Sequence, residues 1–137
     1  MKTGDLVLFR GRGFIAWAIR AWTRSPWAHA GVLWVVEGVP LVIEARFADG
    51  VTCHALANRV DDLPEVFPTG RPLNLSLGLV HLGDWYSVKD ALRAALDEPR
   101  NDNPAGWECA ELAAALLGLD RLARGWTPAA LAELFGA

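Results

Sequence analysis

The chain has 137 residues, 53% of them hydrophobic and 21% charged, with a net charge of −3 at pH 7. This length and balance indicate one folded domain over residues 1–137 and exclude a disordered chain. No apolar run is long enough to cross a bilayer, and the first ten residues lack the apolar stretch of a signal peptide. We therefore expect a cytoplasmic protein by default, with export by another route left open.

The first half of the chain predicts a sheet interrupted by one helix. Apolar residues recur at helical spacing over Phe14 to Thr23, and Ser25-Pro26 ends that helix. Short apolar runs separated by turns at Gly38-Val39-Pro40 and Asp49-Gly50 predict an antiparallel meander. The expected strands are 5–10, 28–36, 41–47 and 51–56.

The second half predicts mostly helices. Prolines punctuate residues 57–85, where we expect short strands near 65–67 and 75–82. Ser87 is a suitable N-cap for a helix to residue 96, and Thr127-Pro128 opens a last helix to about Phe135. A loop over 100–106 precedes a run of helix formers that begins at Cys109. The fold class is therefore α+β, an antiparallel sheet with helices.

Cys109 is the first candidate for chemistry. At the start of a helix, unpaired N–H groups and the helix dipole favour a thiolate, the reactive form of cysteine. The alternative is a buried and inert side chain, since free cysteines are often buried. Cys53 is the only other cysteine, so free thiols in a reducing compartment are expected rather than a disulfide framework.

His29 and Glu44 are candidates to act on that thiol. His29 begins a predicted strand, where a side chain is held rigidly yet stays accessible; the alternative is a hydrogen-bonded core histidine. Glu44 lies within an apolar strand and needs a partner if it is buried, unless it points to solvent at a sheet edge. A loop of residues 38 and 39 would place Glu44 opposite Leu33. Both residues then share a sheet face, but about 13 Å separates them along the strand.

Other chemistries leave little trace in the sequence. The metal-binding spacings CxxC, HxxxH and HExxH do not occur, and no glycine-rich phosphate loop precedes a helix. His54 follows Cys53 directly, so these two side chains point to opposite faces of a strand. We therefore expect no metal and no cofactor. The remaining thiol, imidazole and carboxylate are the parts of a Cys–His–acid nucleophile system.

Four segments together resemble the YiiX-like branch of the NlpC-type cysteine peptidase superfamily. They are Gly4-Asp5-Leu6-Val7-Leu8, Ser25 to Val32 around His29, Val42 to Ala45 with Gly50-Val51, and Trp107 to Leu112 around Cys109. Members of this branch have a circularly permuted papain-like fold, in which the base and acid strands precede the nucleophile helix. The order His29, Glu44, Cys109 matches that permutation, while Ala110 stands where many members have serine.

The resemblance implies that Cys109 is the nucleophile, His29 the base and Glu44 the third polar residue. Tyr86, Trp27 and Trp107 are expected to line the site. The implied function is a thiol hydrolase that cleaves an amide or ester bond through an acyl-thioenzyme, first on a cell-wall peptide or a related substrate. Two alternatives stay open: a lipid acyl hydrolase or acyltransferase, and a non-catalytic binding module of phage or cell-envelope origin.

Charge is spread unevenly along the chain. Residues 1–27 carry five basic groups against Asp5 alone, whereas the rest of the chain is acidic. This basic, Trp-containing segment could meet an anionic surface through residues 10–27, or its arginines could form the solvated face of a helix. We expect peptide, cell-wall or lipid partners and no nucleic acid. The oligomeric state is not indicated.

Overall fold

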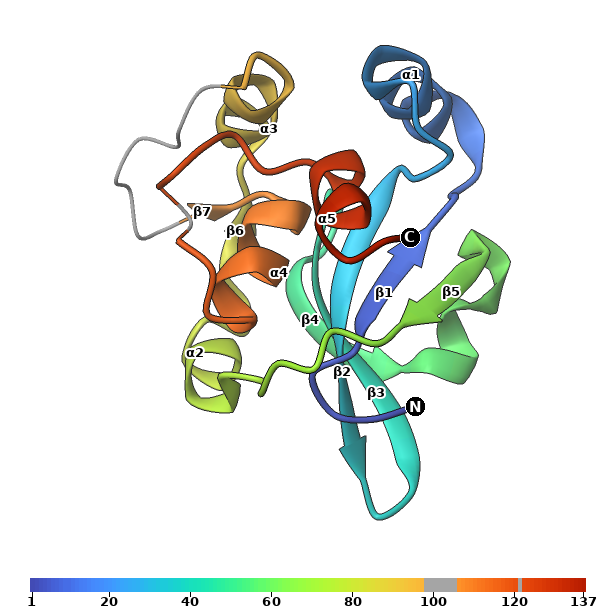
Figure 1. The fold of residues 1–137 in the computed structure, drawn as a ribbon, viewed down its shortest axis with the longest axis vertical. Helices are drawn as coiled ribbons and strands as arrows, with labels where there is room; N and C mark the ends of the chain where they lie inside the picture. Colours follow the sequence, from blue (N-terminus) through green and yellow to red (C-terminus); the bar gives the residue numbers. More distant parts are fainter. Residues whose placement is uncertain (98–105, 121) are drawn as a thin grey trace.

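The computed structural model describes residues 1–97, 106–120 and 122–137. A five-stranded antiparallel sheet runs in the order β4–β3–β2–β1–β5 (Figure 1). Its strands are β1 (Leu6–Phe9), β2 (His29–Val36), β3 (Val39–Arg46), β4 (Gly50–Ala55) and β5 (Pro64–Phe67). A parallel pair is formed by β6 (Trp85–Tyr86) and β7 (Gly106–Trp107). The helices are α1 (Gly13–Thr23), a 3-10 helix η1 (Leu56–Asp62), α2 (Leu75–Val80), α3 (Val88–Ala95), α4 (Cys109–Leu116) and α5 (Pro128–Leu134).

The predicted α+β class is confirmed, and so is the meander of β2, β3 and β4. The helices expected after residues 13, 87 and 127 and at Cys109 are also present. Ser87 and Thr127 cap α3 and α5 as predicted, by accepting from the backbone N–H three residues ahead. The expected 100–106 loop lies outside the described residues except for Gly106.

The strand predicted over residues 75–82 is wrong. This segment forms the short helix α2, and the Asn74 side chain accepts a hydrogen bond from the Leu77 N–H at its start. The alternation of apolar and small residues here resembles a strand. The N-cap and the burial of Gly78 against Ile43 favour the helix instead.

The predicted register of β3 is also wrong, although the predicted face is right. The loop consists of Glu37 and Gly38, both with positive φ, so Val36 pairs with Val39. Glu44 therefore lies opposite Gly31 rather than opposite Leu33. The shift leaves Glu44 two residues from His29 along the strand instead of four.

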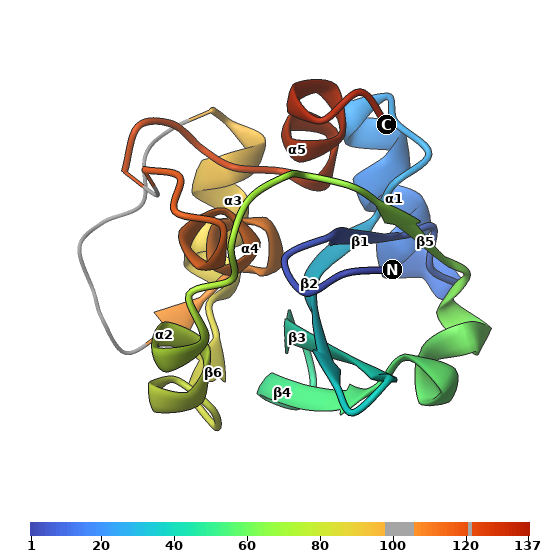
Figure 2. The same cartoon turned by 60° about the horizontal axis from the view of Figure 1, so that its bottom comes forward.

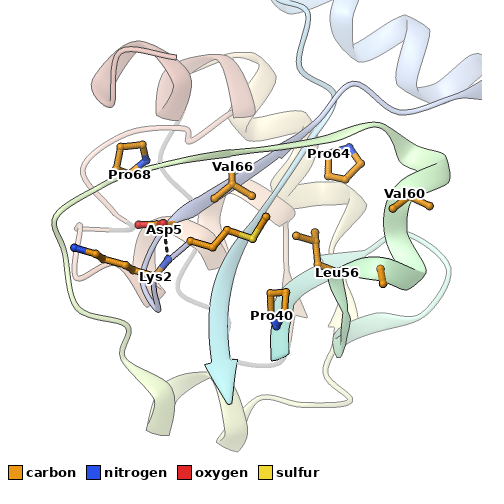
Figure 3. A pocket seen from close by; sticks show the side chains of 10 residues that line it. Lys2, Asp5, Pro40, Leu56, Val60, Pro64, Val66 and Pro68 are labelled. Atoms are coloured by element: carbon orange, nitrogen blue, oxygen red, sulfur yellow. Dashed lines mark hydrogen bonds between the residues drawn. The ribbon is translucent and has the colours of Figure 1, made fainter. Parts of the chain in front are cut away.

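The sheet has a helical side and a lightly covered side. Helices α2, α3 and α4 lie on one side of the sheet, and the segment with η1 lies on the other (Figures 1 and 2). On the first side the buried face of α4 packs with Ile43, Val32 and Leu8 in the main core. On the second side a smaller cluster includes Phe9, Leu33 and Leu56. An apolar hollow of about 780 Å³ on that side is lined by Leu56, Val60 and Val66 among others (Figure 3).

Helix α1 differs from the other long helices because none of its residues is buried. It projects at one end of the molecule, far from the hairpin that joins β2 and β3 (Figure 1). Arg20 anchors it by donating to the carbonyl oxygens of Arg10 and Gly11 at the end of β1. Trp22 Nε1 donates to the Ala95 carbonyl at 3.1 Å, which ties α1 to α3.

Candidate active site

His29 and Glu44 are in direct contact. The His29 Nε2 atom lies 2.7 Å from Glu44 Oε1, across the neighbouring strands β2 and β3. Gly31 makes this approach possible, because a Cβ atom there would lie 2.7 Å from Val42 Cγ2 and 3.1 Å from Glu44 Cβ. The glycine lets β3 lie close to β2 beside the histidine. Glu44 itself is fully buried, as its position in an apolar strand suggested.

Arg59, which sequence reasoning missed, completes the surroundings of Glu44. Its Nε donates to Glu44 Oε2 at 2.8 Å, and its Nη2 donates to Oε1 at 2.7 Å. Arg59 Nη1 also contacts Asp62, and the guanidinium lies over the Phe9 ring at 4.6 Å. The buried carboxylate is thus paired by a guanidinium in a two-point geometry that holds it in place.

The pairing determines the charge on Glu44. Burial alone would raise the pKa of the Glu44 carboxyl, but the hydrogen bonds and charges of His29 and Arg59 lower it to about 2. Glu44 is therefore ionised at any ordinary pH. An ionised carboxylate on Nε2 fixes the orientation of the His29 ring and leaves Nδ1 as the nitrogen for a reacting partner.

Cys109 begins α4, as predicted, and is 4% exposed. Burial raises the pKa of its thiol well above the usual value, and the backbone N–H groups of Ala30 and Ala110 only partly oppose that rise. Ala30 follows His29 in β2, so the sulfur lies beside the strand that carries the histidine. The nucleophile candidate thus contacts both the start of its own helix and the sheet.

Glu108 is the second residue that sequence reasoning did not assign a role. Its carboxylate caps α4 by accepting from the N–H groups of Ala110 and Glu111, and Glu111 reciprocates in a capping box. The same carboxylate accepts the thiol hydrogen bond of Cys109 at 3.0 Å. Burial raises the pKa of Glu108 to about 7, against the opposing effect of these hydrogen bonds.

The expected lowering of the Cys109 pKa is not found. Burial raises the pKa of this thiol well above its usual value, and the charge and hydrogen bond of Glu108 add to that effect. The Ala110 N–H at the helix start still lowers this pKa, but burial and the charge of the capping Glu108 carboxylate outweigh it. In the described part of the chain, the thiol proton is directed to Glu108 and not to His29.

Cys109 and His29 nevertheless share a cavity of about 210 Å³. Its walls include Phe9 and Arg46 on the sheet side and Ile15 on α1. Arg12, Arg59 and Asp62 also line it, and Arg59 is paired there with Asp62 and Glu44. Both residues line this cavity, but Ala30 packs on the α4 face of the sheet, so alternation along β2 turns the His29 side chain toward the opposite face, against Phe9.

A second cavity adjoins the first and also has Cys109 in its lining. This groove has a volume of about 620 Å³ and runs between α1 and α3, with Cys109 and Glu108 among its lining residues. The rest of its lining is nearly all apolar, including Ile15, Trp22 and Leu92. Of the described residues that line the groove, the ionisable ones are Tyr86, Glu108 and Cys109. The volume is typical of a small-molecule site.

Of the three expected lining residues, only Tyr86 reaches these cavities. Tyr86 lines both, and burial, followed by the charges of Cys109 and Glu108, raises the pKa of its hydroxyl well above the usual value. Trp27 lies instead in the core against Phe67 and lines neither cavity. Trp107 is also buried in the core, where its Nε1 donates to Asp84 Oδ2 at 3.2 Å.

No group of three or more His, Cys, Asp or Glu side chains within the described residues could hold a metal ion. Likewise, no helix among residues 1–97, 106–120 and 122–137 is long and apolar enough to cross a membrane.

Comparison with known proteins gives a similarity of fold. Neither a protein-family model nor a curated protein sequence matches the chain. Among solved structures, the chain is similar to one described as the metalloprotein YiiX from Escherichia coli O157:H7, with a TM-score of 0.64 and 20% sequence identity. The similarity covers 97% of this chain and 79% of that one. At this identity it shows that the chain has a YiiX-type α+β fold, and the chemistry must be argued from the site itself.

Proposed function

We propose that this protein is a thiol hydrolase of the permuted papain-like type, which cleaves an amide or ester bond through an acyl-thioenzyme. Cys109 is the nucleophile, His29 the general base and Glu44 the residue that orients His29. The observation that carries the proposal is a shared cavity that Cys109 and His29 both line, with the far nitrogen of His29 held by a buried, ionised carboxylate.

The reaction begins when the thiol proton passes from Cys109 to His29 Nδ1 as the sulfur leaves Glu108. The sulfur attacks the substrate carbonyl, and the imidazolium returns the proton to the departing amine or alcohol. Water, deprotonated by His29, then attacks the thioester and releases a carboxylic acid and the free thiol. Glu44 stays ionised throughout and stabilises the imidazolium.

Tyr86 is suited to stabilise the oxyanion of each tetrahedral intermediate. Its raised pKa keeps the hydroxyl protonated, and it lines both cavities beside Cys109. A neutral hydroxyl can donate a hydrogen bond to the negative charge that develops on the substrate oxygen. In this proposal Tyr86 is a catalytic residue, whereas Trp27 and Trp107 contribute to the core.

The lining of the groove favours the lipid acyl branch over the cell-wall peptide branch. A stem peptide carries charged groups, which need charged or polar partners when they are bound. The groove between α1 and α3 offers apolar side chains such as Ile15 and Leu92 instead. An acyl chain would occupy this groove, while the cavity with Arg12 and Arg46 would take a polar or anionic head group.

Incubation with p-nitrophenyl esters of increasing chain length, followed by intact-mass analysis, tests the proposal. We expect a burst of p-nitrophenol, an acyl adduct on Cys109, and a preference for long chains. Cys109→Ser and His29→Ala should lose burst and adduct, while Cys53→Ser serves as the matched thiol control. A wild-type protein without turnover or adduct, or an adduct that survives in Cys109→Ser, would refute the enzyme and favour a binding module.

A further inference from the structure

Helix α1 presents apolar surface to solvent to an extent that a folded protein rarely leaves uncovered. Phe14 is 77% exposed, Trp17 58% and Trp22 65%, and no α1 residue is buried. Phe14 and Trp17 stack with ring centroids 5.8 Å apart, so their rings form one continuous aromatic surface. Contiguous exposed apolar patches of this kind mark sites of protein or membrane interaction.

The apolar surface continues across the mouth of the groove onto α3. Val88, Leu92 and Leu96 are exposed there, and all three line the groove together with Phe14 and Trp22 of α1. The exposed surfaces of α1 and α3 beside the groove are therefore both apolar. We call the exposed apolar residues of these two helices the rim: Phe14, Ile15, Trp17, Trp22, Val88, Leu92 and Leu96.

Positive charge surrounds the α1 part of the rim. Arg10 and Arg12 precede the helix, Arg20 lies in its last turn, and Arg24 follows it. No acidic residue occurs between Asp5 and Glu37 in the sequence. Within the described residues, the carboxylate paired with Arg10 is that of Glu65, half-exposed and at a long 3.6 Å, and Arg12 Nε donates to the backbone carbonyl of Asp61. These guanidinium charges are thus largely uncompensated by carboxylates.

We propose that the rim docks on an anionic lipid bilayer, with the rings of Phe14, Trp17 and Trp22 at the head-group level and the arginines on lipid phosphates. Tryptophan and arginine together are the residues that interfacial helices use for this purpose. A second copy of the chain is a poorer occupant, because a two-fold contact would bring the same arginines face to face. The docking itself does not depend on Cys109 being reactive.

Docking in this orientation would open the groove directly toward the lipid. The groove is lined by rim residues of both helices and by Cys109. This consequence rests on the proposed function, since it links the bilayer to the acyl substrate. The binding of vesicles is therefore measured separately from turnover, with Cys109→Ser as the protein in which binding should persist unchanged.

Vesicle co-sedimentation of the full chain tests the proposal. The vesicles contain phosphatidylcholine alone or an equal mixture with phosphatidylglycerol. We expect binding to the mixed vesicles that weakens with added salt. Trp17→Ser should reduce the partition coefficient about tenfold, as expected for the loss of one large interfacial side chain. Arg24→Gln should reduce it about fivefold, the contribution of one basic residue near an anionic surface.

Two matched variants at the other end of the molecule are the controls. Val39→Ser changes an apolar side chain of similar exposure at the β2–β3 hairpin, and Lys2→Gln removes one positive charge near the N-terminus (Figures 1 and 3). Both should bind like wild type. The proposal is overturned by equal binding to neutral and anionic vesicles, by equal effects of control and rim variants, or by a lack of binding. A dimer that Trp17→Ser dissociates, without vesicle binding, would assign the rim to self-association.

Discussion

Glu44 Oε1 accepts hydrogen bonds from two groups at the same distance, His29 Nε2 and Arg59 Nη2, each at 2.7 Å. The carboxylate therefore links the imidazole to a buried guanidinium. Arginine supplies the fixed charge that keeps Glu44 ionised, and Glu44 in turn orients the histidine. Under the proposed function we expect the two contacts to differ, with loss of the first impairing turnover and loss of the second impairing stability.

Glu44→Gln should impair both properties. Arg59 would remain buried beside a neutral amide, with Asp62 as its carboxylate partner, so we expect a loss of about 3 kcal/mol in the free energy of unfolding. Turnover should fall at least about a hundredfold, because the imidazolium loses its ionised partner. Urea denaturation and ester hydrolysis measure the two effects.

The control for that change is Glu65→Gln, which removes a half-exposed carboxylate that pairs with Arg10 at the surface. It should change stability by less than about 1 kcal/mol. The double variant Glu44→Gln/Arg59→Met should recover part of the lost stability but none of the lost turnover. Recovery of turnover in the double variant would contradict the assigned role of Glu44.

The contrast between Glu44 and Arg59 shows how far the sequence can be read. A carboxylate in an apolar strand requires a partner, so the pairing of Glu44 could be predicted from one segment. Arg59 lies in a proline-punctuated region without clear periodicity, and its contact depends on how η1 packs on the sheet. The predicted register of β2 and β3 was wrong because the hairpin loop begins one residue earlier, at Glu37. Glu37 adopts a positive φ that a sequence pattern does not specify.

The start of α4 shows a second limit. The helix and its first residue, Cys109, could be predicted from the run of helix formers. The direction of the Cys109 pKa shift could not, because it depends first on how deeply packing buries the sulfur and then on the charge of the side chain that caps the helix. The Glu108 carboxylate accepts from the N–H groups of Ala110 and Glu111, and after burial its negative charge is the next cause of the raised thiol pKa. The capping-box spacing of Glu108 and Glu111 was the available signal.

Gly31→Ala should separate β2 from β3 next to the site. The new methyl group would lie 2.7 Å from Val42 Cγ2 and 3.0 Å from the Ile43 carbonyl oxygen, so the strands must shift. We expect a stability loss of about 1–3 kcal/mol and a fall in turnover larger than the fall in substrate affinity. The double variant Gly31→Ala/Val42→Ala should recover part of the lost stability, because it removes the Val42 methyl group that the new Cβ would meet. Unchanged turnover in a folded Gly31→Ala protein would contradict the need for this close approach.

Stability should pass through a maximum near pH 4.5, because two buried carboxyls shift in opposite directions. The pKa of Glu44 is about 2 when folded, against 4.5 for an exposed glutamate, so its contribution of about 3 kcal/mol is lost as pH falls from 4.5 to 2. The pKa of Glu108 is about 7 when folded. The folded state therefore binds more protons between pH 4.5 and 7, and stability falls as pH rises through that range.

Urea denaturation from pH 2 to 8 checks this profile. Glu108→Gln should remove the decline between pH 4.5 and 7 and keep the acid limb. Glu65→Gln, at the surface, should leave both limbs in place. A wild-type profile that rises steadily from pH 4.5 to 7 would contradict the raised pKa of Glu108.

Glu108→Gln also tests the state of the nucleophile. The amide keeps one oxygen to accept from the helix N–H groups, so α4 stays capped, but the negative charge beside the sulfur is gone. Removal of that charge lowers the pKa of the Cys109 thiol, since the charge and hydrogen bond of Glu108 both raise it in the wild type. A fall of one unit gives about tenfold more thiolate at neutral pH. Alkylation of Cys109 by iodoacetamide should accelerate by at least that factor, as peptide mass analysis would show.

Cys53 lies elsewhere and its alkylation rate should not change, so it is an internal control in the same sample. Equal acceleration at both cysteines would indicate general loosening of the fold, and no acceleration at Cys109 would mean that burial alone holds the thiol protonated.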